Sequence, residues 1–328
     1  MEMLHFPSDG IRKKLYQERT VTFAEERECH LGHCMCDSTT RVKAGGQMRI
    51  GFIGAGKVGF SLGKYFTEHD ISVSGYYSRN PESAKEAAAF TKTKYYRSLQ
   101  DAIKESDTLF LTVPDGSIRE VYSEIIQSDI EGKVLAHCSG ALSSMVFSGI
   151  SLKGAYGYSI HPICAVSSKL TGSQDLSKAY FTIEGDEKYL PVFLDLFHGL
   201  GNPIEVISPE HKVKYHAAAV FASNLVAGLY DIASEMLQDC GLSEEFSQKA
   251  LIPLFAGNAE NIAVHGTTRA LTGPVERADR ETVEKHLKAL TDEEREIYRL
   301  VSAQLVKIAE RKNPDRDYEN MRRLLRKQ

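Results

Sequence analysis

The sequence predicts an α/β protein in which a doubly wound parallel sheet is followed by an all-α C-terminal domain. Three observations lead to this prediction. From residue 48 to about residue 208, short apolar segments alternate with helical patterns, as in a parallel sheet wrapped by helices. A glycine-rich turn joins the first apolar segment to the first helical pattern. After Pro209 the apolar spacing is that of helices alone.

The expected elements of the first part follow one another with short connections. Apolar, β-branched and aromatic residues between turn signals predict the strands, and a spacing of three to four residues predicts the helices. We expect strands at 50–53, 71–77, 108–113, 133–137, 157–160, 180–183 and 203–207, with a short segment at 94–96. We expect helices at 57–68, 81–91, 99–105, 118–126 and 187–200.

The second part is predicted to contain only helices. One long helix is expected at 211–238, and a second begins after Ser243, a good N-cap residue. Thr291 opens a capping box before the last long helix. The domain boundary therefore falls near 208–210, which divides the chain into a nucleotide-binding domain at 48–208 and a helical substrate or dimerisation domain at 209–328.

Composition limits the class of protein. A chain of 328 residues with 42% hydrophobic and 26% charged residues has room for about two globular domains of ordinary composition. The net charge of −4 argues against a nucleic-acid partner, which would favour a basic surface. No apolar run reaches the ~20 residues that span a bilayer, and the N-terminus lacks a secretory signal. We therefore expect a cytoplasmic protein without a membrane partner.

Residues 1–47 differ from the rest because they show no sustained hydrophobic period. We predict that Met48 starts the fold and that residues 1–47 are a disordered extension, with an upstream choice of start codon as the alternative. Cysteine and histidine gather at 29–36, so a zinc site and a role as a zinc-linked interaction protein form one alternative. The spacing is too crowded for paired zinc knuckles, and no second ligand pair follows. The prediction is therefore no metal site.

The glycine-rich turn predicts a dinucleotide-binding site. Gly54 permits the tight turn, Gly56 lets the backbone approach a diphosphate, and Gly59 lets the helix pack close to the strand. The diphosphate would lie on free N–H groups at the positive end of the helix. The alternative is an ordinary glycine-rich turn. The predicted cofactor-binding segment is Gly54-Ala55-Gly56-Lys57-Val58-Gly59.

The end of the second strand indicates which nucleotide binds. NAD-binding versions place Asp or Glu there, where it holds the ribose 2′-hydroxyl. Here the residues are Ser78, Arg79 and Asn80. Arg79 can pair with a 2′-phosphate, and its neighbours can donate hydrogen bonds. The segment predicts NADP as the cofactor, with a solvated arginine in an ordinary turn as the alternative.

Four further motifs resemble a known group of proteins. They lie at 138–142 (CSGAL), 159–162 (SIHP), 215–224 (YHAAAVFASN) and 271–279 (LTGPVERAD). With the glycine turn, they resemble the 6-phosphogluconate dehydrogenase-like superfamily, which includes ketopantoate reductase, pyrroline-5-carboxylate reductase and 3-hydroxyisobutyrate dehydrogenase. The closer resemblance is to Rossmann-like proteins with a DUF2520 C-terminal domain. It implies a Rossmann domain plus a helical domain, NADP, a homodimer joined through helices, and a loop at Val113-Pro114 beside the cofactor.

Two candidate catalytic residues follow predicted strands. Ligands of open α/β sheets bind beyond the carboxyl ends of the strands, where Ser139 and His161 are expected. His161 would donate a hydrogen bond to a substrate oxygen. The alternative is a buried histidine whose ring nitrogens bond the backbone.

The long helix offers two more candidates. His216, Val220 and Asn224 fall at i, i+4 and i+8 along one face. Related reductases carry a proton-donating Lys on the corresponding helix, with Asn at i+4 or i+8. His216 occupies that slot here, although Lys212 or Lys214 could serve instead. A polar seam between domains is the alternative interpretation.

Together these features predict an NADP-dependent oxidoreductase that transfers hydride to a small carbonyl substrate. A 2-oxo acid such as ketopantoate is the candidate by superfamily analogy. Two alternatives stay open. One is an imine reductase of the pyrroline-5-carboxylate type. The other is a regulatory protein that binds NADPH without turnover.

Overall fold

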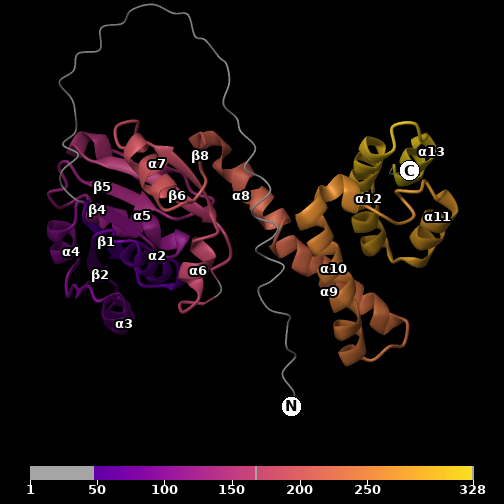
Figure 1. Ribbon diagram of the computed structural model, residues 1–328, viewed down its shortest axis with the longest axis horizontal. Coiled ribbons are helices and arrows are strands. Elements are labelled where there is room, and N and C mark those ends of the chain that lie inside the picture. The colour runs from indigo at the N-terminus through magenta and orange to yellow at the C-terminus, as the bar shows by residue number, and fades with distance from the viewer. Residues whose placement is uncertain (1–47, 167, 327–328) are drawn as a thin grey trace, which may run out of the picture. The chain divides into compact units, whose positions relative to one another are not determined.

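The computed structural model describes residues 48–166 and 168–326, and its centre is one eight-stranded sheet. The strand order is β3-β2-β1-β4-β5-β6-β7-β8, which reverses direction between β1 and β4 (Figure 1). That reversal is the signature of a doubly wound sheet, so the predicted fold class is confirmed. The strands are β1 (Ile50–Ile53), β2 (Val73–Tyr77), β3 (Lys94–Tyr95), β4 (Thr108–Leu111), β5 (Val134–His137), β6 (Tyr156–Ile163), β7 (Tyr180–Gly185) and β8 (Ile204–Val206).

One pair of strands departs from the expected parallel sheet. β6 and β7 run antiparallel, with His161 opposite Thr182. The helix between them, α6 (Gly172–Leu176), has only five residues. At about 1.5 Å per helical residue it cannot run back along an eight-residue strand, which rises about 3.3 Å per residue. The expectation of an all-parallel sheet is therefore wrong at this pair. β6 is also longer than expected, so His161 lies within the strand.

Helices cover both faces of the sheet. On one face, α2 (Lys57–Glu68), α3 (Pro81–Thr91), α6 and α7 (Leu190–Gly199) close a core rich in aromatic rings. On the other, α4 (Leu99–Glu105) and α5 (Asp115–Ile125) close a second, mostly aliphatic core. Both faces of the central strands are thus buried, as their continuous apolar runs require.

The chain is entirely helical after β8, as predicted from Pro209 onward. Ser243 and Thr291 cap the helices expected of them, and Thr291 forms the predicted capping box. The last three helices surround a small core of their own. After the short 3₁₀ turn at Pro209–His211, the helices are α8 (Lys212–Phe221), α9 (Asn224–Asp239), α10 (Glu244–Ala270), α11 (Arg280–Ala289), α12 (Asp292–Lys312) and α13 (Glu319–Leu325).

The single long helix expected at 211–238 is wrong, because the chain breaks at Ala222 and Ser223 between α8 and α9. Ser223 has φ −130° and ψ −81°, outside the helical range. Its hydroxyl donates to the carbonyl oxygen of Ala219 at 2.7 Å. A serine that bonds back to residue i−4 competes with the helical ladder and bends the helix.

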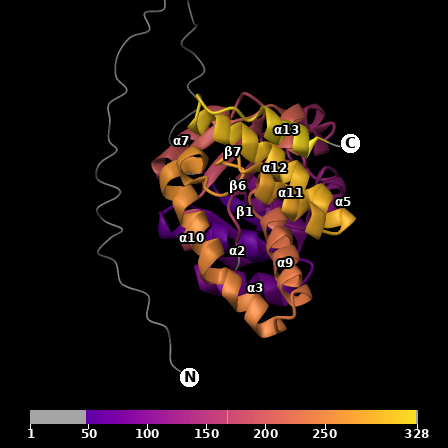
Figure 2. The same ribbon diagram turned by 90° about the vertical axis from the view of Figure 1, so that its right-hand side faces the viewer.

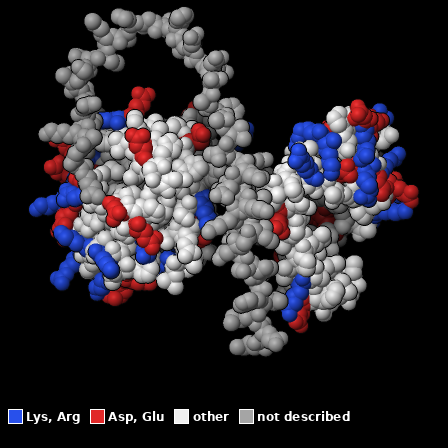
Figure 3. Space-filling view, viewed as in Figure 1, with Lys and Arg blue, Asp and Glu red and all other residues white. Residues whose placement is uncertain are grey.

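α9 and α10 run side by side (Figure 2). Large apolar side chains of both helices are exposed. Only Ser234 of α9 is buried, and only Ser247 and Ala270 of α10 are. Much of the surface over this pair carries no charge (Figure 3). Within the described residues, Pro209–Asp239 is the one helical segment long and apolar enough to cross a membrane, and 6% of its apolar window is buried.

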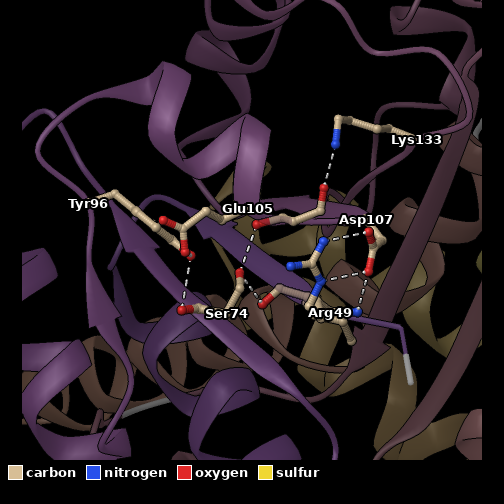
Figure 4. A network of polar contacts seen from close by, with 8 residues as sticks. Arg49, Ser74, Tyr96, Glu105, Asp107 and Lys133 are labelled. Atoms are coloured by element: carbon tan, nitrogen blue, oxygen red, sulfur yellow. Dashed lines mark hydrogen bonds and ion pairs between the residues drawn. The ribbon is translucent and has the colours of Figure 1, made fainter. Parts of the chain in front are cut away.

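A polar network ties the amino ends of the central strands together (Figure 4). The Arg49 guanidinium and backbone N–H donate to the Asp107 carboxylate, each at 3.1 Å. Ser74 and Ser106 share a hydrogen bond of 2.7 Å, and Lys133 donates to the Ser106 carbonyl oxygen. The hydrogen bond and charge of Arg49 lower the pKa of Asp107. The network holds β1, β4 and β5 in register at this end.

We expect Asp107→Asn to lower the free energy of unfolding by about 1 kcal/mol at pH 7, since it replaces one partly exposed, bidentate ion pair. The folded-state pKa of Asp107 is depressed, so the carboxylate stabilises the fold above pH ~4 and loses this effect as the pH falls. Urea unfolding should show the full difference at pH 7 and a smaller one at pH 3. Asp195→Asn, on the exposed side of α7, is the matched control, and an equal loss in both variants would contradict the assignment.

Candidate functional site

The glycine turn after β1 has the geometry of a backbone ligand site. Gly54 has φ +102°, and a Cβ there would lie 2.9 Å from the backbone of Thr112 and Val113. A Cβ on Gly59 would lie 2.2 Å from the Thr112 hydroxyl oxygen. That hydroxyl donates to the Gly54 carbonyl oxygen at 2.8 Å. Gly54 and Gly59 therefore do the two structural tasks predicted for them, and they bring α2 close to β4.

Gly56 differs from its neighbours because nothing but the Thr112 carbonyl oxygen, at 3.9 Å, would lie near a Cβ there. The space beside Gly56 is open. Gly56 is also the N-cap of α2, with no side-chain cap and no acidic residue in the first turn. The N–H groups that begin a helix need acceptors, and here no side chain supplies one. The turn thus fits a bound anion such as a diphosphate.

A cavity of about 210 Å³ opens at this turn. Most of the residues predicted to bind the cofactor line this cavity. Lys57, Val58, Gly59 and Asn80 of the predicted set do not line it, and the Asn80 side chain instead caps α3 by accepting from the Glu82 N–H. The residues that line it are Ile53, Gly54, Ala55, Gly56, Tyr77, Ser78, Arg79, Leu99, Thr112, Val113, Pro114, Val121 and Glu124.

Arg79 lines this cavity, and its guanidinium contacts two side chains of α5. One nitrogen is 3.3 Å from a carboxylate oxygen of Glu120, and another donates to the Ser117 hydroxyl at 3.2 Å. Both charged side chains are more than half exposed. A pair of this kind is weak in water, so Arg79 can exchange Glu120 for a more highly charged phosphate.

A second polar cluster forms where β5, β6 and α8 meet. Its centre is Lys212, whose side chain is 1% exposed. The ammonium donates to the Ser139 carbonyl oxygen at 3.2 Å and lies 5.2 Å from the centre of the Tyr215 ring. Burial lowers the pKa of Lys212, and the negative charge of Glu184 partly opposes that effect. A buried ammonium with one hydrogen-bond acceptor keeps two N–H groups for another partner.

His161 projects from β6 into this cluster. Its Nδ1 lies 2.6 Å from the Tyr215 hydroxyl oxygen, and the two rings are perpendicular. Burial lowers the pKa of His161 to about 3, and the positive charges of Lys212 and His216 act in the same direction. His161 is therefore a neutral imidazole at neutral pH.

His216, on α8, lies beside His161 and next to Gly140. A Cβ on Gly140 would lie 2.6 Å from His216 Nδ1 and 2.8 Å from His161 Nε2, so both nitrogens converge above that glycine. His216 Nδ1 is buried and has no hydrogen-bond partner in the described part of the chain. A buried nitrogen without a partner is costly, and it indicates a place where a ligand atom can bind.

Ser139 lies in the cluster, but its hydroxyl is occupied. It donates to the Asp115 carboxylate at 2.7 Å and accepts from the N–H groups of Ala141 and Leu142. The Ser139 N–H donates to Nδ1 of the fully buried His137. These bonds shape the turn after β5, and it is the Ser139 carbonyl oxygen that reaches Lys212.

Asn224 lies elsewhere. It begins α9 after the helix break, its side chain is exposed, and its Oδ1 accepts from the Ser223 hydroxyl. The prediction placed it on the face of His216 because one continuous helix was expected. That premise fails at Ser223, so the structure gives Asn224 no contact with the cluster.

Sequence reasoning missed Tyr215 and Gly140 and treated Lys212 as a secondary choice. All three lie in or next to motifs already singled out, but a one-dimensional pattern does not show which side chains are buried together. The i, i+4 spacing of Lys212 and His216 was the available signal. Among residues 48–326, the described part contains no group of three His, Cys, Asp or Glu side chains arranged for a metal. The cysteines at 29–36 lie outside the described residues.

Comparison with protein families assigns a domain to each half of the chain. Residues 35–162 match the model of a Rossmann-like domain, and residues 179–305 match that of a domain of unknown function, DUF2520. These are the two domains that the motifs resembled. The DUF2520 match begins before β7, earlier than the predicted boundary near 208–210. Comparison with curated protein sequences finds no match.

Solved structures share the fold over most of their length. Protein TM1727 from Thermotoga maritima has 27% identity and a TM-score of 0.64, covering 80% of this chain and 98% of that one. BF3122 from Bacteroides fragilis, provisionally described as an NADP oxidoreductase, has 23% identity and 0.62 over the same shares. A pyrroline-5-carboxylate reductase from Coxiella burnetii has 13% identity and 0.53, covering 81% and 98%.

Proposed function

We propose that this chain, which joins a Rossmann-like domain to a DUF2520 domain, is an NADP-dependent reductase of small carbonyl compounds. The observation that carries the proposal is the position of two sites at one edge of the sheet. The glycine turn and its cavity follow β1 and β4, while the cluster of Lys212, His161 and His216 lies at the ends of β5 and β6. Ligands of doubly wound sheets bind at this edge.

The nucleotide site fits NADP by its donors. The uncapped first turn of α2 would bind the diphosphate, and the open space beside Gly56 would let it approach. Arg79 at the cavity rim would pair with the 2′-phosphate. When bound, NADPH supplies a hydride from C4 of its nicotinamide. Provisional naming of the Bacteroides fragilis relative as an NADP oxidoreductase supports this choice of cofactor.

The cluster supplies the remaining part of the reaction, which is charge stabilisation and a proton. Lys212 would stabilise the negative charge that develops on the substrate oxygen, because it is buried and has N–H groups to spare. His216 would deliver the proton from Nδ1, the nitrogen that has no partner within the described structure. Neutral His161 would orient the same oxygen.

The donors favour a carbonyl over an imine. Lys212, His161 and His216 present nitrogens only. Lys212 carries a positive charge, and His216 carries a second one while it holds the proton to be transferred. The nearby carboxylates are engaged elsewhere, since Asp115 accepts from Ser139 and Glu184 accepts from both the N–H and the hydroxyl of Ser144. A developing oxyanion is stabilised in such surroundings, whereas a cationic iminium would be repelled by Lys212. A 2-oxo acid fits this chemistry.

We expect Arg79→Asp to weaken NADPH binding at least tenfold more than NADH binding, because a like charge would replace the partner of the 2′-phosphate. Titration calorimetry with both nucleotides measures the two dissociation constants. The matched control is Arg97→Asp, an exposed arginine outside the cavity. If both nucleotides lose affinity equally in the Arg79 variant, Arg79 does not select NADP.

The reaction itself is tested by single-turnover oxidation of bound NADPH with a panel of 2-oxo acids and cyclic imines. A 2-oxo acid should oxidise NADPH, and His216→Ala should slow that step about 10²- to 10³-fold, as expected for loss of a proton donor. His211→Ala, an exposed histidine just before α8, is the control. Oxidation by imines alone would favour the imine reductase, and binding without oxidation across the panel would favour the regulatory protein.

We further propose that two chains associate through α9 and α10. Large apolar side chains lie open on α10 and at the end of α8, namely Phe246, Ile252 and Leu254 of α10 and Phe221 of α8, which are 53–71% exposed. A groove of about 1130 Å³ between α9, α10 and α12 has mostly apolar walls. Insertion of Pro209–Asp239 into a membrane is disfavoured, because Lys212 at its start is held against Ser139 of the sheet domain. A second copy covers such a surface without displacing Lys212.

Light scattering should therefore give twice the chain mass of 36.5 kDa at micromolar concentration. Leu254→Glu should shift the protein to the monomer, because it puts a charge into the apolar contact. Leu152→Glu, at a still more exposed leucine of the sheet domain, should leave the mass unchanged. A monomeric wild-type protein would refute the dimer.

A further inference from the structure

The contact between Tyr215 and His161 determines how the imidazole can serve the proposed reductase. The phenol oxygen and Nδ1 are 2.6 Å apart, a short distance for a hydrogen bond between neutral groups. The two residues come from different elements, α8 and β6, and are 54 positions apart in the chain. The bond therefore fixes the ring of His161 relative to α8, where Lys212 and His216 are also located.

Burial, together with the charges around it, keeps the His161 ring neutral. Lys212 places an ammonium in the same cluster, and His137 and His216 add no negative charge. The carboxylates in range of Lys212, on Asp115 and Glu184, are bonded to serines. A neutral imidazole carries one N–H, on either Nδ1 or Nε2. The hydrogen bond made by one nitrogen therefore determines whether the other nitrogen carries the proton.

Chemistry decides the direction of the Tyr215 bond. A phenol is a stronger donor than a neutral imidazole N–H, and an unprotonated imidazole nitrogen is a stronger acceptor than a phenol oxygen. Burial raises the pKa of Tyr215 and outweighs the opposing effect of a hydrogen bond to Thr182, so the phenol keeps its proton. The O–H of Tyr215 thus donates to Nδ1, and the single imidazole proton resides on Nε2.

Nε2 is the nitrogen that faces the point above Gly140, where His216 Nδ1 also converges. Glycine at residue 140 lets the two rings come this close to the backbone, because a methyl group there would lie within 2.8 Å of both nitrogens. The two rings stand nearly perpendicular, at 86°, with centroids 6.3 Å apart. The Cβ position is only one bond from the glycine Cα, so a ligand oxygen that contacts both nitrogens would lie farther out, beside Gly140.

We propose that Tyr215 is a positioning residue that holds His161 in the Nε2–H tautomer, so that His161 donates a hydrogen bond to the substrate oxygen beside Gly140. This role rests on the proposed reductase function. It makes His161 a donor that orients the carbonyl, and it assigns the transferred proton to another group of the cluster. Tyr215 acts only through His161.

The tautomer is measured directly by NMR of the full chain labelled with ¹⁵N-histidine. Long-range ¹H–¹⁵N spectra distinguish a protonated Nε2 from a protonated Nδ1, and His161→Gln assigns the signals by their loss. The wild-type protein should show His161 with Nε2 protonated at pH 7. In Tyr215→Phe the same ring should become a mixture of both tautomers. Tyr230→Phe removes a phenol on α9 that donates to the Gln248 carbonyl oxygen, and it should leave the His161 signals unchanged.

Gly140→Ala is the second variant, since its methyl group must displace both rings. It should shift the His161 and His216 signals together. A wild-type Nδ1–H tautomer, an unchanged His161 pattern in Tyr215→Phe, or unchanged signals in Gly140→Ala would each overturn the proposal.

Kinetics separate this proposal from the reductase function. Tyr215→Phe should lower kcat for the carbonyl substrate at least tenfold and leave the NADPH dissociation constant unchanged, because Tyr215 does not line the nucleotide cavity. If no carbonyl is reduced by the wild-type protein while the NMR results hold, the reductase function fails and the tautomer assignment stands. If turnover is normal in Tyr215→Phe while its tautomer changes, the positioning role in catalysis is wrong.

Discussion

The close approach of α2 to β4 at the glycine turn is the constraint on which the rest of the site depends. Gly59 and Gly54 touch Thr112 at distances that leave no space for a Cβ. That contact aims the start of α2 at the carboxyl edge of the sheet and leaves its first N–H groups without side-chain acceptors. Gly56, in the same turn, has open space beside it. The backbone is thereby prepared to bind an anion before any ligand arrives.

The proton-handling cluster depends on a different feature, which is the length of β6. Antiparallel pairing with β7 extends β6 past His161, so that the imidazole projects from a rigid strand. The first turns of α8 bring Lys212, Tyr215 and His216 to the same place. Lys212 is the only fully buried cation among the described residues, and its charge adds to burial in lowering the pKa of His161. The two sites are thus built independently by the two halves of the sheet and share one edge.

Local signals in the sequence were sufficient for much of the fold. The glycine turn, Ser243 and Thr291 act over a few residues, so their patterns predicted the structure correctly. The helix break at Ser223 was missed because helical periodicity continues across it, and only a back-bond from one hydroxyl interrupts the ladder. The antiparallel β7 was missed because strand direction depends on where the connection packs.

The candidate site was predictable to a similar extent. The sequence placed His161 and His216 in the site, because one follows a strand and the other lies on the helix after the sheet. Tyr215 and Gly140 could not be found in that way, because their roles arise from contacts that are distant in the sequence. Tyr215 contacts His161, which is 54 positions away, and Gly140 lies against His216, which is 76 positions away. Ser139 was named as a candidate from its place after a strand. In the structure its carbonyl oxygen accepts from Lys212, while its hydroxyl donates to Asp115.

Titration calorimetry of Gly56→Val with NADPH tests the central claim most directly. Because a Cβ at Gly56 meets no protein atom closer than 3.9 Å, the variant should fold with the thermal stability of the wild type. It should nevertheless lose NADPH binding, since the valine side chain would occupy the place of the diphosphate, while the wild-type chain binds one NADPH. A wild-type protein without affinity for NADPH, or a folded Gly56→Val that binds it equally well, would contradict the account.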